Sequence, residues 1–391
     1  MDYNKLLADA AKEMRPSGIR RFFDIANEMG NCISLGVGEP DFKTPWAIRD
    51  AGIRSLEQGH TWYTSNAGLK DLRAEICNYL ARRFDLHYTP EHETLVTVGG
   101  SEAIDMCIRA LVSPGDEVII PEPCYVSYLP ITTLTGGVPV SIPLQEKNGF
   151  KLTAEELKAA ITPKTKLLVL PFPCNPTGAV MRKEDWLPIV EVLQDTNIMV
   201  LSDEIYAELT YGTERHFSVA ALPGMKERTI LVNGFSKAFA MTGWRLGYAC
   251  GPAEIISIMT KIHQSCIMCA PSTSQFAAVT ALRSCDDDIE KMRMEYDQRR
   301  KLLVTSLNRM GLHCFEPEGA FYVFSSIKST GMSSEDFCEK LLYAKRLAVI
   351  PGTAFGDAGE GFIRISYSYS IGHLTEALHR MEQFLGEISN G

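Results

Sequence analysis

The chain has 391 residues, of which 45% are hydrophobic and 22% are charged. This composition excludes a disordered protein, and a length well above that of one compact core favours two domains. The formal net charge of -9 disfavours nucleic acid as a partner, because binding to phosphate backbones requires a basic surface.

The N-terminal residues 1–18 are polar and charged, and they lack the apolar core of a signal peptide. No uncharged apolar run approaches the length of a membrane span, so we expect no membrane association and a cytoplasmic location. Eleven cysteines without disulfide-like spacing fit a reducing compartment. Cys266 and Cys269 form a lone CxxC, and without a second pair or a histidine couple we interpret them as ordinary thiols and expect no metal site.

Residues 94–251 alternate short apolar runs with longer helical patterns. The first run, 94–100, ends in glycines, and apolar residues at helical spacing follow in 101–112. Further strands are expected at EVIIPE (117–122), VPVSIP (138–143), KLLVLPFP (166–173), IMVLSDEI (198–205), TILVNGF (229–235) and RLGYACG (245–251). This alternation is typical of an α/β fold with a mostly parallel sheet covered by helices, and the near-continuous apolar runs indicate strands buried on both faces.

The last hundred residues have a different pattern. A charge-rich helical segment over about 286–309 leads into short strands at FYVFSSI, LAVIPG and FIRISYS, and the helical pattern HLTEALHRMEQFL closes the chain. This pattern predicts a smaller α+β unit. We therefore expect a large domain of residues 46–290 and a small domain of residues 1–45 and 291–391, with the N-terminal arm packed on the small unit.

Ligands of parallel α/β sheets bind beyond the carboxyl ends of the strands, and four groups of residues follow strands here. The first, from Gly99 to Glu102, places the free N–H groups of a following helix where they can bind an anion. A simple helix cap is the alternative. The second holds Asn175 between two prolines, which stiffen the backbone, and its alternative is an ordinary turn.

The third group places Asp203 where an apolar run ends, as either a helix N-cap or the buried partner of a cation. Tyr206 follows three residues later, near the same face if a helical turn begins there. In the fourth group, Lys237 follows a strand among apolar residues, where desolvation lowers the pKa of a lysine and makes its amine nucleophilic. Arg245 lies eight residues beyond Lys237 and can fold back to hold a phosphate with its planar fork.

The run SKAFAMTGWRLGY resembles the cofactor-lysine signature of class I aminotransferases, which belong to the fold type I group of pyridoxal phosphate enzymes. Seven further segments are similar to family segments and follow the family's order: LGVGEPDFKTP, WYTSNAGLKDLR, VTVGGSEAI, PCNPTGAV, LSDEIY, GAFYVF and FIRISYS. Eight blocks in the family's order are specific evidence for the resemblance, whereas any one block alone would be weak evidence. The resemblance implies the fold of that group, with pyridoxal 5'-phosphate as cofactor.

By this resemblance, Lys237 binds the cofactor aldehyde covalently, and Asp203 lies against the pyridine nitrogen and keeps the ring protonated. Asn175 and Tyr206 are expected to hydrogen-bond the phenolic oxygen of the cofactor. Lys237, Asp203 and Tyr206 form the expected catalytic set. Tyr125 matches the aromatic residue that stacks on the ring, with a core tyrosine as the alternative.

The resemblance places the cofactor phosphate against the N–H groups of Gly100, Ser101 and Glu102, the hydroxyl of Ser236 and the guanidinium of Arg245. Many relatives have a phosphate-binding serine or threonine three residues before the lysine, where this chain has Gly234, so Ser236 is the candidate substitute. Tyr63 matches a tyrosine that reaches the phosphate of the neighbouring subunit. A homodimer with active sites at its interface is therefore expected.

Arg364 matches the arginine that grips the substrate α-carboxylate in a bidentate pair. Gly38 matches a backbone N–H that contacts the same carboxylate, and Asn175 is a further substrate contact. A strand-face salt bridge is the alternative for Arg364, but its place within an apolar run favours a bound anion. The resemblance thus implies transamination between an α-amino acid and a 2-oxo acid, with Lys237 as the proton carrier and ping-pong kinetics.

The chain is similar in character to aromatic and aspartate aminotransferases and to the aminotransferase A group, which acts on N-acetyl-diaminopimelate. Some aspartate aminotransferases carry a lysine at the position of Ser101 that binds the side-chain carboxylate, so its absence disfavours strict aspartate use. Arg20 is a candidate second cation near the entrance. By family habit, 2-oxoglutarate is the expected acceptor.

Three alternatives belong to other classes. A pyridoxal-phosphate-dependent carbon–sulfur β-lyase would share the cofactor residues and differ in its products. A cofactor-sensing transcription regulator needs an added DNA-binding domain, which we do not expect because the family pattern begins within the first twenty residues. A Rossmann dehydrogenase would need GxGxxG after its first strand, and LGVGEPDF does not supply it.

Overall fold

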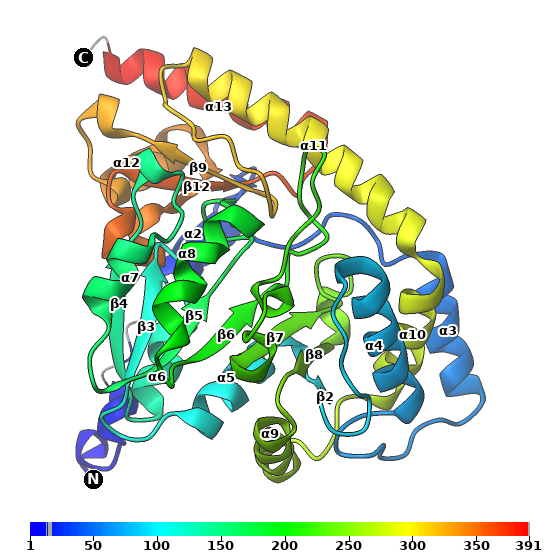
Figure 1. Cartoon of the computed structure of the whole chain (residues 1–391). Coiled ribbons are helices and arrows are strands. Elements are labelled where there is room, and N and C mark those ends of the chain that lie inside the picture. Colours follow the sequence, from blue (N-terminus) through cyan, green and yellow to red (C-terminus); the bar gives the residue numbers. More distant parts are fainter. Residues whose placement is uncertain (13, 15–17, 390–391) are drawn as a thin grey trace.

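The computed structural model describes residues 1–12, 14 and 18–389, and its centre is a seven-stranded sheet (Figure 1). The strands lie in the order β2-β8-β7-β6-β5-β3-β4. Their bounds are β2 (Thr94–Thr97), β3 (Glu117–Glu122), β4 (Val138–Pro143), β5 (Thr165–Leu170), β6 (Met199–Asp203), β7 (Thr229–Gly234) and β8 (Gly247–Cys250). β8 runs antiparallel to β2 and β7, and every other neighbouring pair is parallel. The predicted α/β fold with a mostly parallel sheet is therefore confirmed.

Helices cover both faces of this sheet (Figure 1). Successive strand residues point to opposite faces, and both sets are apolar here, so each face needs helices to bury it. In β3, Val118 and Ile120 belong to the core beneath α5 (Gly99–Leu111). Ile119 belongs to the opposite core, beneath α8 (Lys183–Gln194). Both cores are apolar, which explains why the strands appear in the sequence as unbroken apolar runs. The other helices of this part are α3 (Trp46–Glu57), α4 (Lys70–Phe84), α6 (Tyr128–Leu134), α7 (Ala154–Ala160), α9 (Ala253–Cys266) and α10 (Ser272–Ser284).

The long helix α11 (Asp286–Arg309) runs from α10 to the C-terminal part of the chain, as the charge-rich pattern predicts (Figure 1). Beyond it, three antiparallel strands lie in the order β11-β12-β9. They are β9 (Tyr322–Ser326), β11 (Ile350–Pro351) and β12 (Phe362–Ser366), and α12 (Ser334–Lys345) and α13 (Ile371–Ser389) complete this part. The division into domains of residues 46–290 and of residues 1–45 with 291–391 stays a prediction.

The expected strand at LAVIPG is divided between two sheets. β10 (Leu347–Ala348) pairs in parallel with β1 (Ile33–Ser34) of the N-terminal arm, whereas β11 pairs with β12. The arm therefore contributes a strand to the C-terminal part, and α2 (Gly18–Glu28) contacts β10 and β11. The pairing of β1 with β10 places the segment that follows β1 beside β12.

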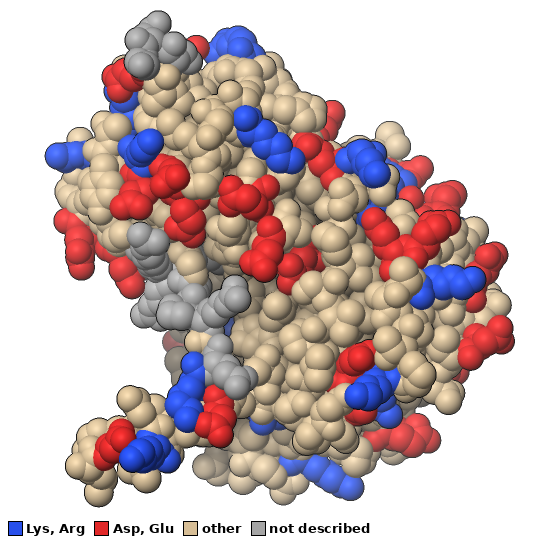
Figure 2. Space-filling view, turned by 90° about the vertical axis from the view of Figure 1, so that its left-hand side faces the viewer, with Lys and Arg blue, Asp and Glu red and all other residues tan. Residues whose placement is uncertain are grey.

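The first residues of the arm lie elsewhere. α1 (Asp9–Lys12) contacts α6 at the edge of the large sheet, and Figure 2 shows this segment standing out from the body of the molecule. None of its residues is buried, so no core holds it on the small sheets. On the face shown in Figure 2, Lys and Arg side chains are interspersed with Asp and Glu side chains.

Candidate active site

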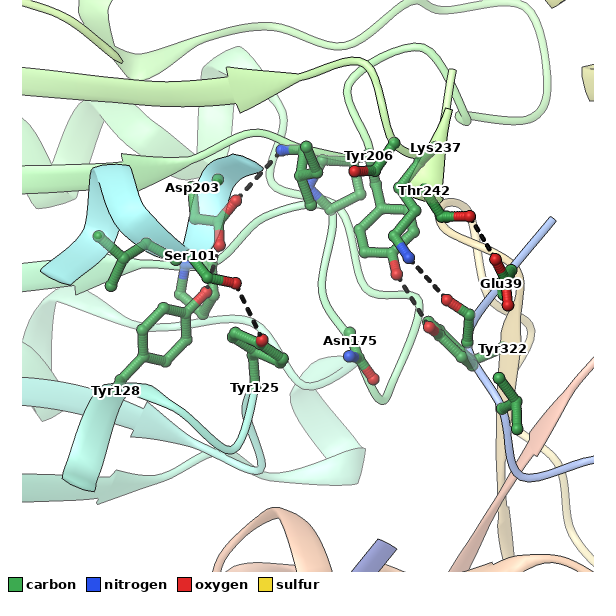
Figure 3. Close-up of a pocket in the computed structure, with 18 of the residues that line it drawn as sticks. Glu39, Ser101, Tyr125, Tyr128, Asn175, Asp203, Tyr206, Lys237, Thr242 and Tyr322 are labelled. Carbon is green, nitrogen blue, oxygen red and sulfur yellow. Dashed lines mark hydrogen bonds between the residues drawn. The ribbon is translucent and has the colours of Figure 1, made fainter. Parts of the chain in front are cut away.

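The carboxyl ends of the strands and the segment after β1 enclose a cavity of about 700 Å³. β2, β3, β5, β6 and β7 all end at this edge, and β8 begins there because it runs in the opposite direction. The cavity lining contains all of the predicted site residues except Glu102 and Tyr63: Gly38, Gly100, Ser101, Tyr125, Asn175, Asp203, Tyr206, Ser236, Lys237, Arg245 and Arg364. Figure 3 labels six of them, and it shows that they come from different elements and surround one space: Ser101, Tyr125, Asn175, Asp203, Tyr206 and Lys237.

Lys237 follows β7 and reaches across the cavity to the segment after β1. Its Nζ donates a hydrogen bond to the carbonyl oxygen of Gly38, over a distance of 2.6 Å (Figure 3). Desolvation is the largest cause that lowers the pKa of Lys237, to about 8, and the nearby Glu39 carboxylate opposes part of this decrease. About one-tenth of such amines is unprotonated at pH 7, far more than for an ordinary lysine, so Lys237 is a competent nucleophile.

Asp203 ends β6 and is buried at the inner end of the cavity. Its Oδ2 accepts a hydrogen bond from the Tyr128 hydroxyl at 2.7 Å, and its Oδ1 accepts one from the Ile205 N–H at 3.2 Å. The described residues that directly follow β6 form no helix, so Asp203 is not a helix N-cap. Burial raises its pKa, and a cation placed against the carboxylate would lower it again.

The start of α5 and Arg245 form a cradle for an anion. Gly99 has a φ of +78°, and a side chain there would bring its Cβ within 2.6 Å of Arg245 Nη2. Glycine thus allows the guanidinium to lie against the first turn of α5, where free N–H groups and the helix dipole favour negative charge. Ser101 Oγ lies 3.3 Å from the Tyr125 hydroxyl at the same helix end. Ser236 lines this cavity as well.

The side chain of Glu102 points away from the cavity. Its carboxylate accepts hydrogen bonds from the Val98 N–H and from His263 Nδ1, the latter at 2.8 Å. Only the backbone of Glu102, in the first turn of α5, remains available to an anion. Packing explains why position 234 is a glycine, because a Cβ there would lie 2.9 Å from Gly247 Cα in β8. The serine or threonine found at this position in many relatives has no room here.

Arg364 lies in the middle of β12, and only 2% of it is exposed. Its Nη1 donates to Asn175 Oδ1 at 2.9 Å, and its Nη2 donates to the carbonyl oxygen of Gly36. Its Nε is buried without a hydrogen-bond partner, and the acidic neighbours of this cation in the described part of the chain are tyrosines, with no carboxylate among them. A buried cation with an unpaired donor is costly unless an anion binds to it, so Arg364 is suited to a carboxylate ligand.

Besides Glu102, one predicted residue lies outside the cavity lining. Tyr63 is 78% exposed and lies outside the lining, so it cannot reach the cavity of its own chain without a rearrangement. Arg20 lies on α2, but its side chain falls outside the described part of the structure. The contact of Tyr63 with a neighbouring subunit stays a prediction.

Four lining residues with polar side chains were not predicted from the sequence: Glu39, Tyr128, Thr242 and Tyr322. Three of them lie within the segments that resemble the family, so their positions gave a signal that was not used. Tyr128 lies outside those segments, and its spacing of three residues from Tyr125 was the one feature of the sequence that could have indicated it. The hydroxyl of Thr242 donates to Glu39 Oε1 across the mouth of the cavity (Figure 3).

The family model described as "Aminotransferase class I and II" matches residues 30–381. The chain belongs to this family. A protein of Bacillus subtilis named YugH is 56% identical over 97% of this chain and 98% of the relative. An aspartate aminotransferase of Pyrococcus abyssi is 45% identical over 97% of this chain and 98% of its own length. The crystal structure of an aromatic aminotransferase from Pyrococcus horikoshii is 44% identical, with a TM-score of 0.90 over 94% of this chain and 99% of that one.

The transaminase therefore uses pyridoxal 5'-phosphate, and its cavity has the chemistry that this cofactor requires. The desolvated amine of Lys237 suits the aldehyde, the buried carboxylate of Asp203 suits a protonated ring nitrogen, and the cradle at Arg245 suits the phosphate. In the part of the chain that the structure describes, no helix is long and apolar enough to span a bilayer. The same residues contain no cluster of three or more His, Cys, Asp or Glu side chains that could hold a metal ion.

Proposed function

We propose that this transaminase moves the amino group of an α-amino acid to 2-oxoglutarate by a ping-pong mechanism. The proposal rests on the arrangement of three groups in one cavity. The amine of Lys237 has a lowered pKa, Asp203 is a buried carboxylate in the same lining, and Arg364 is a buried cation there that lacks an anionic partner. The inner end of the cavity thus suits the cofactor, and the end near Arg364 suits the substrate.

When bound, the cofactor withdraws electrons from the substrate α-carbon, which makes the α-proton acidic. Lys237 Nζ would hold the cofactor between turnovers, and its free amine would act as the general base that accepts the α-proton of the substrate. Asp203 would hold a proton on the ring nitrogen by its negative charge. Tyr206 and Asn175 would donate hydrogen bonds to the phenolic oxygen, and Tyr125 would cover one face of the ring.

The phosphate is proposed to lie on the N–H groups of Gly100, Ser101 and Glu102, with Ser236 and Arg245 as side-chain donors. The α-carboxylate of the substrate is proposed to bind Arg364 in a bidentate pair and the N–H of Gly38. The unpaired Nε of Arg364 supports this role, because a carboxylate supplies the acceptor that the protein does not. Asn175, already bonded to Arg364, orients the same carboxylate.

The charges of the lining favour donors with an uncharged side chain. Lys237, Arg245 and Arg364 are the cations among the described lining residues, and each already has a proposed partner. Relatives are named as aspartate or aromatic aminotransferases, and for this chain we propose an aromatic donor ahead of aspartate and of N-acetyl-diaminopimelate. The second carboxylate of 2-oxoglutarate extends one methylene farther from the α-carbon than that of aspartate, and we propose that Arg20 or a partner subunit supplies its cation there.

The donor is identified from the absorption spectrum of the purified protein, recorded before and after single amino acids are added without any oxo acid. An aromatic donor is expected to bleach the band of the lysine-bound cofactor more than about tenfold faster than aspartate, because one unpaired buried charge costs at least that factor. Addition of 2-oxoglutarate should restore the band. A band that no donor bleaches would contradict the proposal, and release of pyruvate and ammonia from cystathionine without an acceptor would indicate a β-lyase.

We propose a homodimer in which Tyr63 completes the cofactor site of the other subunit. Exposed apolar side chains on α3 and in the following loop support an interface there, among them Trp46, Ile53, Leu56 and Trp62. Tyr63 lies in that loop and is itself exposed. Its hydroxyl would donate a hydrogen bond to the phosphate, and a bond to a charged group contributes about tenfold or more in affinity.

Replacement of Tyr63 by phenylalanine is therefore expected to raise the dissociation constant of the cofactor by about tenfold, measured by titration of the cofactor-free protein. Tyr343→Phe, which removes an exposed hydroxyl from α12, is the matched control and should change nothing. Sedimentation should show a dimer at the concentrations used. Full activity of a monomer, or an unchanged dissociation constant for Tyr63→Phe, would contradict the proposed interface.

We propose that the enzyme acts in the cytoplasm. All eleven cysteines are free thiols, and most of them are buried in the cores of the protein. Free thiols in these numbers are typical of proteins from reducing compartments.

A further inference from the structure

Tyr322 lies between the two ends of the cavity and contacts groups from both. Tyr322 is the first residue of β9 and is almost completely buried. It lies two residues before Phe324, which pairs with Arg364 of β12. Its hydroxyl oxygen lies 2.8 Å from the hydroxyl oxygen of Tyr206 (Figure 3). The guanidinium of Arg364 lies 4.4 Å above its ring. Tyr322 thus joins Tyr206, a proposed cofactor contact, to Arg364, the proposed carboxylate contact.

The surrounding backbone is shaped to admit the Tyr322 hydroxyl. A Cβ at Gly38 would lie 1.9 Å from that oxygen, so any larger residue at this position would displace it. Position 38 therefore requires glycine for steric reasons, in addition to the role proposed for its backbone N–H. Its carbonyl oxygen accepts the hydrogen bond from Lys237 Nζ, which brings the three groups to one place.

The direction of the hydrogen bond between the two tyrosines follows from the role proposed for Tyr206. If the Tyr206 O–H donates to the phenolic oxygen of the cofactor, the Tyr206 oxygen can only accept from Tyr322. A donor that itself accepts a hydrogen bond is polarised and donates more strongly. We propose, on the basis of the function above, that Tyr322 is a positioning residue with two separable parts: its hydroxyl strengthens the hydrogen bond of Tyr206, and its ring supports Arg364.

The two parts predict different consequences. A hydrogen bond to the phenolic oxygen withdraws negative charge that would otherwise stabilise a proton on the nitrogen joining Lys237 to the cofactor. A weaker Tyr206 bond therefore raises the pH at which the absorption band of the lysine-bound cofactor changes. The ring of Tyr322 acts on the substrate end instead, because it holds the guanidinium of Arg364 by cation–π contact and packing. Loss of the ring raises KM.

The experiment compares Tyr322→Phe, Tyr322→Leu and Tyr206→Phe in the cofactor-loaded protein. We expect Tyr322→Phe to raise the midpoint of the spectral pH titration by about 0.3 to 0.7 unit, with KM changed less than about twofold, since one neutral hydrogen bond is removed. Tyr322→Leu should give the same spectral shift and a KM about tenfold higher. Tyr206→Phe should shift the midpoint further, and adding Tyr322→Phe to it should have no additional effect, as expected for one chain of hydrogen bonds.

Tyr367→Phe is the matched control, because it removes another buried hydroxyl near β12, one that donates to the Ala320 carbonyl oxygen at 3.2 Å. It should leave the midpoint and KM unchanged. An unchanged midpoint in Tyr322→Phe, or additive shifts in the double variant, would overturn the inference while Tyr206→Phe still shifts. If Tyr206→Phe does not shift the midpoint either, the role proposed for Tyr206 is wrong, and a wild-type protein without the band would refute the role of Lys237.

Discussion

Replacement of Lys237 by alanine is expected to lower kcat by at least about 10⁴-fold and to remove the absorption band of the lysine-bound cofactor. Lys237 is the one lysine of the described cavity lining, so no neighbouring amine can replace it as the link or as the proton carrier. The measurement is single-turnover bleaching by a donor, followed by steady-state kcat. The variant should stay folded, because the substitution removes a desolvated amine that stabilises no carboxylate through a salt bridge.

The matched control is Lys261→Ala, which removes an exposed lysine from α9. It should retain the band and kcat within about twofold, as surface substitutions usually do. A Lys237→Ala protein that still shows the band, or that keeps more than about a hundredth of the activity, would refute the assignment of Lys237.

The pKa of Lys237 adds a pH dependence to this prediction. Only the unprotonated amine attacks the cofactor aldehyde, and its pKa is lowered to about 8 by desolvation. The rate at which the cofactor-free protein captures the cofactor should therefore rise about tenfold per pH unit below 8 and level off above it. Stopped-flow absorption measures this rate. A plateau reached only above about pH 10, the range of an ordinary lysine, would contradict the lowered pKa.

Replacement of Arg364 by leucine is expected to lower kcat/KM for an amino acid donor by about 10² to 10⁴-fold, mainly through KM. The variant removes two charge-assisted hydrogen bonds to the α-carboxylate, each of which contributes roughly one to two powers of ten. The decisive comparison is with the decarboxylated amine of the same donor. That amine never used the arginine, so its already low kcat/KM should change less than about threefold.

Two further variants test whether this loss is specific. Arg364→Lys keeps the charge but lacks the planar fork, so its kcat/KM should fall between those of the wild type and the leucine variant. Arg309→Leu, at the exposed end of α11, should have no effect on either substrate. Equal losses for the amino acid and for the amine would show that Arg364 stabilises the fold instead of binding the carboxylate.

The order of elements follows from the sequence because each depends on local patterns. Apolar runs of four to six residues became the strands of the large sheet, and the acidic first turn of α11 begins at Asp286, near the predicted position. The carboxyl ends of parallel strands share one edge, so residues such as Asp203, Asn175 and Lys237 could be assigned to one cavity. Their chemical types then favoured a covalently held cofactor.

The sequence could not predict which partners those side chains find across the cavity. Tyr128 bonds Asp203 and Tyr322 bonds Tyr206 over long separations in the chain, and no local pattern encodes such pairs. The division of LAVIPG between two sheets has the same origin, because pairing with the N-terminal arm competes with pairing to β12.

The sequence by itself determined the family, the alternation of strands and helices, and the residue types at the strand ends, since these depend on local periodicity and on short motifs. Only the tertiary structure decided that the carboxylate of Glu102 points away from the cavity, that Tyr63 is exposed, and that Gly234 has no room for a side chain. These outcomes depend on the direction of each side chain and on the close approach of β8, and both are set by packing between distant segments.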